Sequence, residues 1–307
     1  MKTFLWLVRR ELWESRIIWM APAICALIVI GCALLVALNV GTLQLDGFDF
    51  EQFRSDQGAQ KLGEMTSHGL ALLSVPFFMI VLVTQYFYAA DSLYSERRDR
   101  SILFWKSLPI SDTATVLSKL AVVAVVMPAA AAACALVSQL AVFAIVSIRF
   151  ASSAGIVVHL WQPAVWGGWL ALLTYLMLAS ALWHLPKHAW LLLVSAWAPR
   201  SAAMFALLPP CGIMLAEFIV LRTHAVWSLI GDRFGYMGVL VHALGDRVEN
   251  GFSIVIDGKS VLMPHSVASM MRPLDFIASP AVWIGVAFAA VAVGAAIWMR
   301  RYRDSTI

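Results

Sequence analysis

The segment from Ile17 to Val40 constrains this chain most, because it runs for 24 residues without a charged side chain. A helix rises 1.5 Å per residue, so this run is long enough to cross the hydrocarbon core of a bilayer, which is about 30 Å thick. It is also longer than the apolar part of a signal peptide. We therefore expect an uncleaved membrane span over residues 17–40.

Five more apolar runs follow along the chain, which is 61% hydrophobic and only 13% charged. A soluble domain carries about 25% charged residues, so a soluble globular enzyme, a disordered chain and a nucleic-acid-binding protein are all excluded. We predict an all-α fold with six transmembrane helices in a single transmembrane domain over residues 1–307. The further spans are predicted at about 69–90, 113–148, 164–199, 201–222 and 280–299.

The run 164–199 is too long for one straight span, and the motif His184-Leu-Pro-Lys-His188 interrupts it. It could cross the membrane once, with a kink near Pro186, or twice. Two crossings would place Arg300–Arg303 outside, against the enrichment of lysine and arginine in cytoplasmic loops. We therefore expect one crossing and both termini in the cytoplasm, with 13 of the 22 basic residues on that side. Pro128 lies within the third span, and Pro209-Pro210 is expected to break the fifth.

Three segments outside the spans have their own patterns. From Met1 to Arg16, apolar residues recur at helical spacing and charges fill the other face, which predicts an amphipathic helix in the headgroup layer. The outer segment 41–68 is acidic. The outer segment 223–279 contains a strand-like stretch, Phe252–Ile256, and is long enough for a small extracytoplasmic cap.

The motifs that could carry chemistry are weak. Gly258-Lys259-Ser260 resembles the end of a phosphate-binding loop, but position 253 is Ser where that loop needs Gly, so we expect no ATP site in this chain. The pair His184 and His188 lacks a third metal ligand. The four cysteines lie in apolar runs without a Cys-x-x-Cys pair. We therefore expect neither a metal nor a cofactor.

Glu217 is the clear ionisable residue within a predicted span, where a charge is costly and normally has a partner or lines water. It could be structural, near the outer interface and one turn from Arg222. It could instead line a substrate path or act in gating. The sequence leaves both readings open.

The segment 91–112 joins the second and third spans and combines charge with apolar residues. A charged block, Glu96–Arg100, precedes the apolar stretch Ile102–Trp105. Pro109 then stops the helix, and Ser111 or Asp112 can cap the next one. A short helix of this kind suits docking in a groove on a partner. The alternative is a helix that only floats at the membrane surface.

The stretch from Tyr94 to Pro109 resembles the cytoplasmic loop of ABC-2-type exporter permeases, which show E-R-x-x-x-[ST], then apolar residues, then S-L-P. Looser matches are Arg9–Glu14 before the first span, Ser195–Arg200 between the fourth and fifth, and the ends of the last span at Ser279–Trp283 and Arg300–Asp304. The long broken fourth run and the large last outer loop depart from the family pattern. They leave the substrate class and the outer gate open.

The resemblance implies a non-catalytic permease subunit of an ATP-driven exporter in the bacterial inner membrane. Such a subunit forms the translocation path with a second copy of itself or a related permease, and each half binds a separate cytoplasmic ATPase that holds ATP and Mg²⁺. The implied ATPase-coupling residues are Glu96, Arg97, Arg98, Arg100, Leu103, Phe104, Trp105 and Leu108. Weaker candidates for the substrate path are Phe77, Phe78, Met204, Phe205, Met214 and Glu217. The rival hypotheses are a membrane-embedded enzyme that uses Glu217 and the histidines, and a scaffold that moves nothing.

Overall fold

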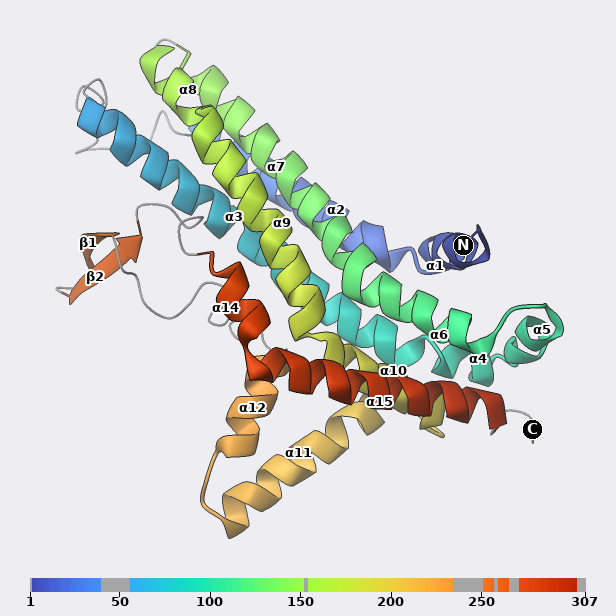
Figure 1. The fold of residues 1–307 in the computed structure, drawn as a ribbon. Helices are drawn as coiled ribbons and strands as arrows, with labels where there is room; N and C mark the ends of the chain where they lie inside the picture. Colours follow the sequence, from blue (N-terminus) through green and yellow to red (C-terminus); the bar gives the residue numbers. More distant parts are fainter. Residues whose placement is uncertain are drawn as a thin grey trace.

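The computed structural model describes residues 2–39, 56–151, 154–234, 251–256, 259–264 and 271–302, and these are helical apart from one two-stranded hairpin (Figure 1). The first half of the chain forms α1 (Lys2–Glu14), α2 (Ile17–Asn39), α3 (Asp56–Asp91), α4 (Tyr94–Arg98), α5 (Ile102–Ser107), α6 (Asp112–Ala121), the π-helix η2 (Val122–Val126) and α7 (Met127–Arg149). The second half forms α8 (Ala154–Leu160), α9 (Pro163–Trp183), α10 (Leu185–Trp197), α11 (Ala202–Val220), α12 (Ala225–Phe234), β1 (Gly251–Ile256), β2 (Lys259–Pro264), α14 (Pro273–Ala278) and α15 (Pro280–Tyr302).

Six helical stretches of the described chain are long and apolar enough to cross a membrane. In chain order they are α2, then α3, then the continuous stretch α6–η2–α7, then Val157–Trp183, which ends with α9. The last two are α11 and α15. The predicted number and order of the spans are therefore confirmed, and the chain is a multi-pass membrane protein. The strand-like stretch in the last long loop is β1, which pairs antiparallel with β2.

Helices α9 and α10 meet at His184, close to the kink expected near Pro186. Gln162, just before α9, lies beside Gly63 near the start of α3. At the other end, the Ser195 hydroxyl of α10 accepts hydrogen bonds from the backbone N–H groups of Leu93 and Tyr94, just after α3, at 3.0 Å each. The α9–α10 pair therefore runs once along the full length of α3, in the opposite direction.

Pro128, inside the third span, changes the type of helix around it. Pro128 has no N–H for the carbonyl of Val123, five residues earlier, and the chain forms a π-helical turn here in which the Met127 N–H bonds to the Val122 carbonyl. The Gln85 side chain of α3 donates to the Val123 oxygen at 2.8 Å and replaces the missing donor. Pro128 thus produces a local change of helix type, and the span continues through it.

The break expected at Pro209-Pro210 is wrong, because α11 is continuous from Ala202 to Val220. Pro210 leaves the carbonyl of Ala206, four residues earlier, without its helical donor. The indole N–H of Trp190, on α10, donates to that oxygen at 3.1 Å. A neighbouring helix therefore satisfies the backbone group that the proline frees, as membrane helices commonly require.

The core lies between α3, α7, α9, α10 and α15, while α2 and α11 have large exposed apolar faces. Small residues on α15 (Gly285, Ala289, Ala292, Ala296) are buried, and the alanines pack against Ala189 and Leu192 of α10, which lets the two helices approach closely. In Figure 1 α11 leans away from this bundle, and α12 returns from its far end toward the start of α15.

Candidate functional site

The segment after α3 folds into two short helices, α4 and α5, where the sequence predicted one. Arg100 lies between them with φ 56°, a left-handed conformation that turns the chain. After α5 the chain becomes extended at Leu108, before Pro109, and the Ser111 hydroxyl accepts a hydrogen bond from the Ala114 N–H at 3.1 Å to cap α6. Figure 1 shows α4 and α5 at the same end of the bundle as α1, α6 and the C-terminal end of α15.

Glu96 is the centre of a buried ion-pair network at this end, and its side chain is only 4% exposed. One carboxylate oxygen lies 3.1 Å from Arg10 of α1 and 3.1 Å from Lys119 of α6. The other oxygen lies 2.6 Å from the Arg300 guanidinium of α15. A single carboxylate on α4 therefore binds cations from three other helices that are far apart in the sequence.

A second buried carboxylate, Glu11 of α1, completes the network. It lies 2.9 Å from Lys119 and 3.1 Å from Arg10, and it accepts a hydrogen bond from the Tyr88 hydroxyl at 2.8 Å. Arg300 also pairs with Asp112 at 3.0 Å. The buried or half-buried carboxylates Glu96, Glu11 and Asp112 thus face three cations and balance their charge, while the exposed Glu14 forms a further pair with Arg10.

Arg10 connects the two halves of this network through its guanidinium. Burial by itself would lower the pKa of Arg10, but the neighbouring Glu11, Glu14 and Glu96 carboxylates raise it above the ordinary arginine value. Arg10 is therefore a permanent cation. Its guanidinium also lies 3.8 Å from the centre of the Trp105 ring, which holds α5 against α1.

Arg97 attaches α4 to the end of α10. Its guanidinium donates hydrogen bonds to the carbonyl oxygens of Ser195 at 2.7 Å and of Ala198 at 3.0 Å. Together with the Ser195 hydroxyl bonds to Leu93 and Tyr94, these contacts join the loop to the turn between α10 and α11. The loop is consequently fixed to neighbouring helices and is not a free connection.

The structure divides the eight coupling candidates into two groups. Glu96 and Arg97 bind other parts of this chain, and Trp105 lies against Arg10, so these three side chains make contacts within the chain. Arg98, Arg100, Leu103 and Phe104 are exposed, the two apolar side chains by 60% and 59%, and Leu108 is half-buried. We call Arg98, Arg100, Leu103 and Phe104 the exposed face of the loop.

Sequence reasoning missed the part of Glu11, Lys119 and Arg300 in this network, because it used Lys119 and Arg300 only as markers of topology and Glu11 only as part of the charged face of the N-terminal helix. One signal was present: Lys119 lies inside an apolar run, where an unpaired charge is costly. Its partner could not be found from sequence, because Glu11 is 108 residues away along the chain.

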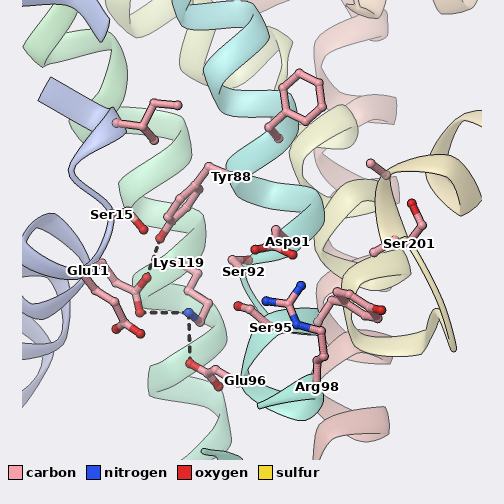
Figure 2. A pocket seen from close by; sticks show the side chains of 16 residues that line it. Glu11, Ser15, Tyr88, Asp91, Ser92, Ser95, Glu96, Arg98, Lys119 and Ser201 are labelled. Atoms are coloured by element: carbon pink, nitrogen blue, oxygen red, sulfur yellow. Dashed lines mark hydrogen bonds and ion pairs between the residues drawn. The ribbon is translucent and has the colours of Figure 1, made fainter. Parts of the chain in front are cut away.

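A cleft of about 750 Å³ lies beside the network, between α1, α3, α4 and the start of α11 (Figure 2). Glu11, Lys119 and Glu96 meet at one side of it, as the dashed lines in Figure 2 show, and Tyr88 closes it above them. Its wall at the start of α11 includes Ser201. The cleft therefore borders the carboxylates that hold the loop, which are themselves buried.

The structure does not bring the substrate-path candidates together. Phe77 and Phe78 are 1% and 7% exposed and belong to different parts of the core. Phe205 packs edge-on against Trp197. Met204 is exposed on α11, and Met214 lines a separate cavity of about 540 Å³ between α11 and α12.

Glu217 has a structural role in this arrangement. Its carboxylate accepts hydrogen bonds from the Thr223 hydroxyl at 2.8 Å and from the backbone N–H groups of Ala225 and Val226 at 2.7 and 2.9 Å. These N–H groups begin α12, where a negative charge is favourable. Of the two readings of Glu217, the geometry favours the structural one.

The four cysteines are free thiols, and no group of three or more potential metal ligands occurs among the described residues. Comparison of the chain with protein families, with curated proteins and with solved structures finds no match.

Proposed function

We propose that this chain is the permease subunit of an ATP-driven exporter of the ABC-2 type. In this proposal two such subunits form the translocation path, and segment 91–112 of each one couples to a separate cytoplasmic ATPase. The permease is not itself an enzyme, and ATP and Mg²⁺ belong to the partner. The observation that carries the proposal is the attachment of this segment, through Glu96, to α1, α6 and α15.

The attachment matters because a coupling element must move the spans when a partner moves it. Glu96 and Arg97 link α4 rigidly to the ends of four other helices, so a displacement of α4 is passed to all of them. A loop that only floats at a membrane surface needs no buried ion pairs. Packed helices change between discrete arrangements, which suits a transport cycle driven by ATP.

The exposed face of the loop supplies the surface for the ATPase. Leu103 and Phe104 are large apolar residues that this chain leaves uncovered, next to the cations Arg98 and Arg100. Such a surface fits an apolar groove on the partner with carboxylates at its rim. Glu96 and Arg97 hold this surface in place and do not contact the partner.

The proposal includes a topology in the bacterial inner membrane. Arg10 and Arg300 bind the same carboxylate, so the N-terminal helix and the C-terminal end of α15 lie at one end of the bundle. We place this end in the cytoplasm, because it carries most of the basic residues. Leu5, Trp6 and Trp13 of α1 are all at least 60% exposed, which suits a helix in the headgroup layer. The hairpin and α14 then belong to an extracytoplasmic cap.

Cross-linking and affinity purification of the full-length chain from its native membranes test the coupling role. The wild-type chain is expected to retain an ATPase that carries a phosphate-binding loop, and Leu103→Asp with Phe104→Asp is expected to lose it. Leu229→Asp, an equally exposed apolar position on α12, is the matched control and should retain it. Retention of the same ATPase by the Leu103/Phe104 variant would exclude the exposed face as its binding surface.

A further inference from the structure

Three basic side chains are buried at the junction of α9 and α10. His184, Lys187 and His188 are 2%, 4% and 0% exposed, and all belong to the first turn of α10 or the residue before it. The two imidazole ring centres lie 6.2 Å apart. The coupling role does not use these residues, which lie toward the opposite end of α10 from Ser195.

Several of their polar atoms lack a partner in this structure. The Nδ1 of His184 donates to the Arg233 carbonyl oxygen at 2.9 Å, but its Nε2 has no hydrogen-bond partner among the described residues. Both ring nitrogens of His188 also have none there. Lys187 forms no ion pair or side-chain hydrogen bond within the described part of the chain. Buried groups of this kind normally have partners, so these atoms indicate an interaction with a ligand.

The neighbouring charged side chains indicate whether that ligand is an anion or a cation. Arg233 of α12 adds a further cation, and its guanidinium donates to the carbonyl oxygens of Trp183 and Ala281 and lies 3.8 Å from the centre of the Trp183 ring. On the other side, α15 presents the small residue Gly285, which packs against Pro186 and Arg233. The acidic side chain next in sequence, Asp232, is exposed.

These charges argue against a metal ion. Lys187 lies between the two histidines in the sequence, the backbone of Arg233 contacts His184, and no group of three or more metal-ligating side chains occurs in the described part of the chain. An anion, in contrast, accepts hydrogen bonds from the Lys187 ammonium group and from an N–H of His188. A group with several oxygen acceptors can satisfy both at once.

We propose that His184, Lys187 and His188 form a binding site for a phosphate group, carried by a lipid headgroup or by a soluble molecule. Lys187 and His188 contact the phosphate, and His184 contributes through Nε2 when this nitrogen is protonated. His188 is fully buried, so binding requires an opening of the packing around this junction, to which Arg233 fastens α12. The site does not depend on the proposed coupling to an ATPase, since it lies within this chain alone.

Native mass spectrometry of the purified full-length chain tests the site without any ATPase. Three probes are titrated separately: phosphatidylglycerol, phosphatidylcholine and inorganic phosphate. The dissociation constant for phosphatidylglycerol is expected to be at least about tenfold lower than that for phosphatidylcholine, because the choline cation of phosphatidylcholine neutralises the charge of its phosphate. Binding of inorganic phosphate as well would identify a soluble source, and binding of phosphatidylglycerol alone would identify a lipid.

Variants locate the binding. Lys187→Gln with His188→Gln is expected to abolish the preference for phosphatidylglycerol. Arg200→Gln with Arg301→Gln, which removes two exposed cations at the other end of the bundle, is the control and should keep it. Equal binding of both lipids by the wild-type chain, without binding of phosphate, would overturn the proposal even if the Lys187/His188 variant fails to fold. An unchanged preference in that variant would also overturn it.

Discussion

At the scale of single residues, Glu96 is the group on which this end of the bundle depends. Glu96→Ala removes the carboxylate that pairs with Arg10, Lys119 and Arg300, and leaves the buried network with one positive charge more than its remaining carboxylates, Glu11 and Asp112, can balance. Loss of one partner from a buried ion pair costs about 3–5 kcal/mol, so we expect the free energy of unfolding to fall by that amount. Denaturant titration of the protein in detergent micelles measures it.

The matched control for Glu96 is Asp99→Ala, three residues later in the same loop. Asp99 pairs with Arg98 at 3.0 Å, but both side chains are more than half exposed, and exposed pairs contribute little. We expect almost no change in the free energy of unfolding for the Asp99→Ala variant. If Glu96→Ala and Asp99→Ala have equal effects, the network does not stabilise the fold.

Trp190 tests a different kind of contact, a hydrogen bond to a carbonyl that a proline leaves free. Trp190→Phe keeps an aromatic side chain but removes the indole N–H that donates to Ala206. We expect a loss of about 1 kcal/mol in the free energy of unfolding. Trp298→Phe, on an exposed face of α15, should cost less, and a greater loss in that control would contradict this role of Trp190.

At the scale of elements, the π-helical turn follows from Pro128 and Gln85 together. If Gln85 replaces the N–H that Pro128 lacks, Gln85→Leu should destabilise the wild-type chain more than it destabilises the Pro128→Ala variant. In the Pro128→Ala background, a backbone N–H is again available to the third span. A double-mutant cycle should give a coupling energy of at least about 0.5 kcal/mol, and additive effects would contradict the compensation.

The prolines within the third and fifth spans have effects that the sequence alone does not determine. The apolar runs and the charges between them predicted six spans, because these depend on the bilayer and on local composition. Whether Pro128 or Pro209-Pro210 interrupts a helix depends on a donor from another helix, Gln85 or Trp190, and no local pattern reveals it. The apolar run likewise predicted a span from Gly69, whereas α3 begins at Asp56, because the helix continues beyond its apolar part.

The candidate site was predictable to a similar extent. The loop was found from its charged and apolar blocks, and Ser111 was one of two cap candidates, with Asp112, after Pro109. The sequence did not distinguish Glu96, which faces inward, from Arg98, which faces outward, although both lie in one charged block. That distinction depends on Lys119 and Arg300, which the fold brings from distant parts of the chain.

At the scale of the whole molecule, we expect α9 and α10 to cross the membrane once. Reporter tags inserted at Gln162 and at Arg200 should lie on opposite sides, with the Arg200 tag and a C-terminal tag both in the cytoplasm. Protease accessibility in intact cells and in inverted vesicles measures this. Tags at Gln162 and Arg200 on the same side would show two crossings.

We expect the loop of α4 and α5 to couple a partner's ATP hydrolysis to movement of the spans. The most direct measurement is the ATPase rate of the purified complex, with wild-type permease and with Glu96→Gln, at equal amounts of bound ATPase. We predict that Glu96→Gln retains the ATPase, because the exposed face is unchanged. In this variant hydrolysis should no longer move α15, and a spin label at position 301 measures that movement. Full ATP-dependent movement of α15 in Glu96→Gln would contradict the account.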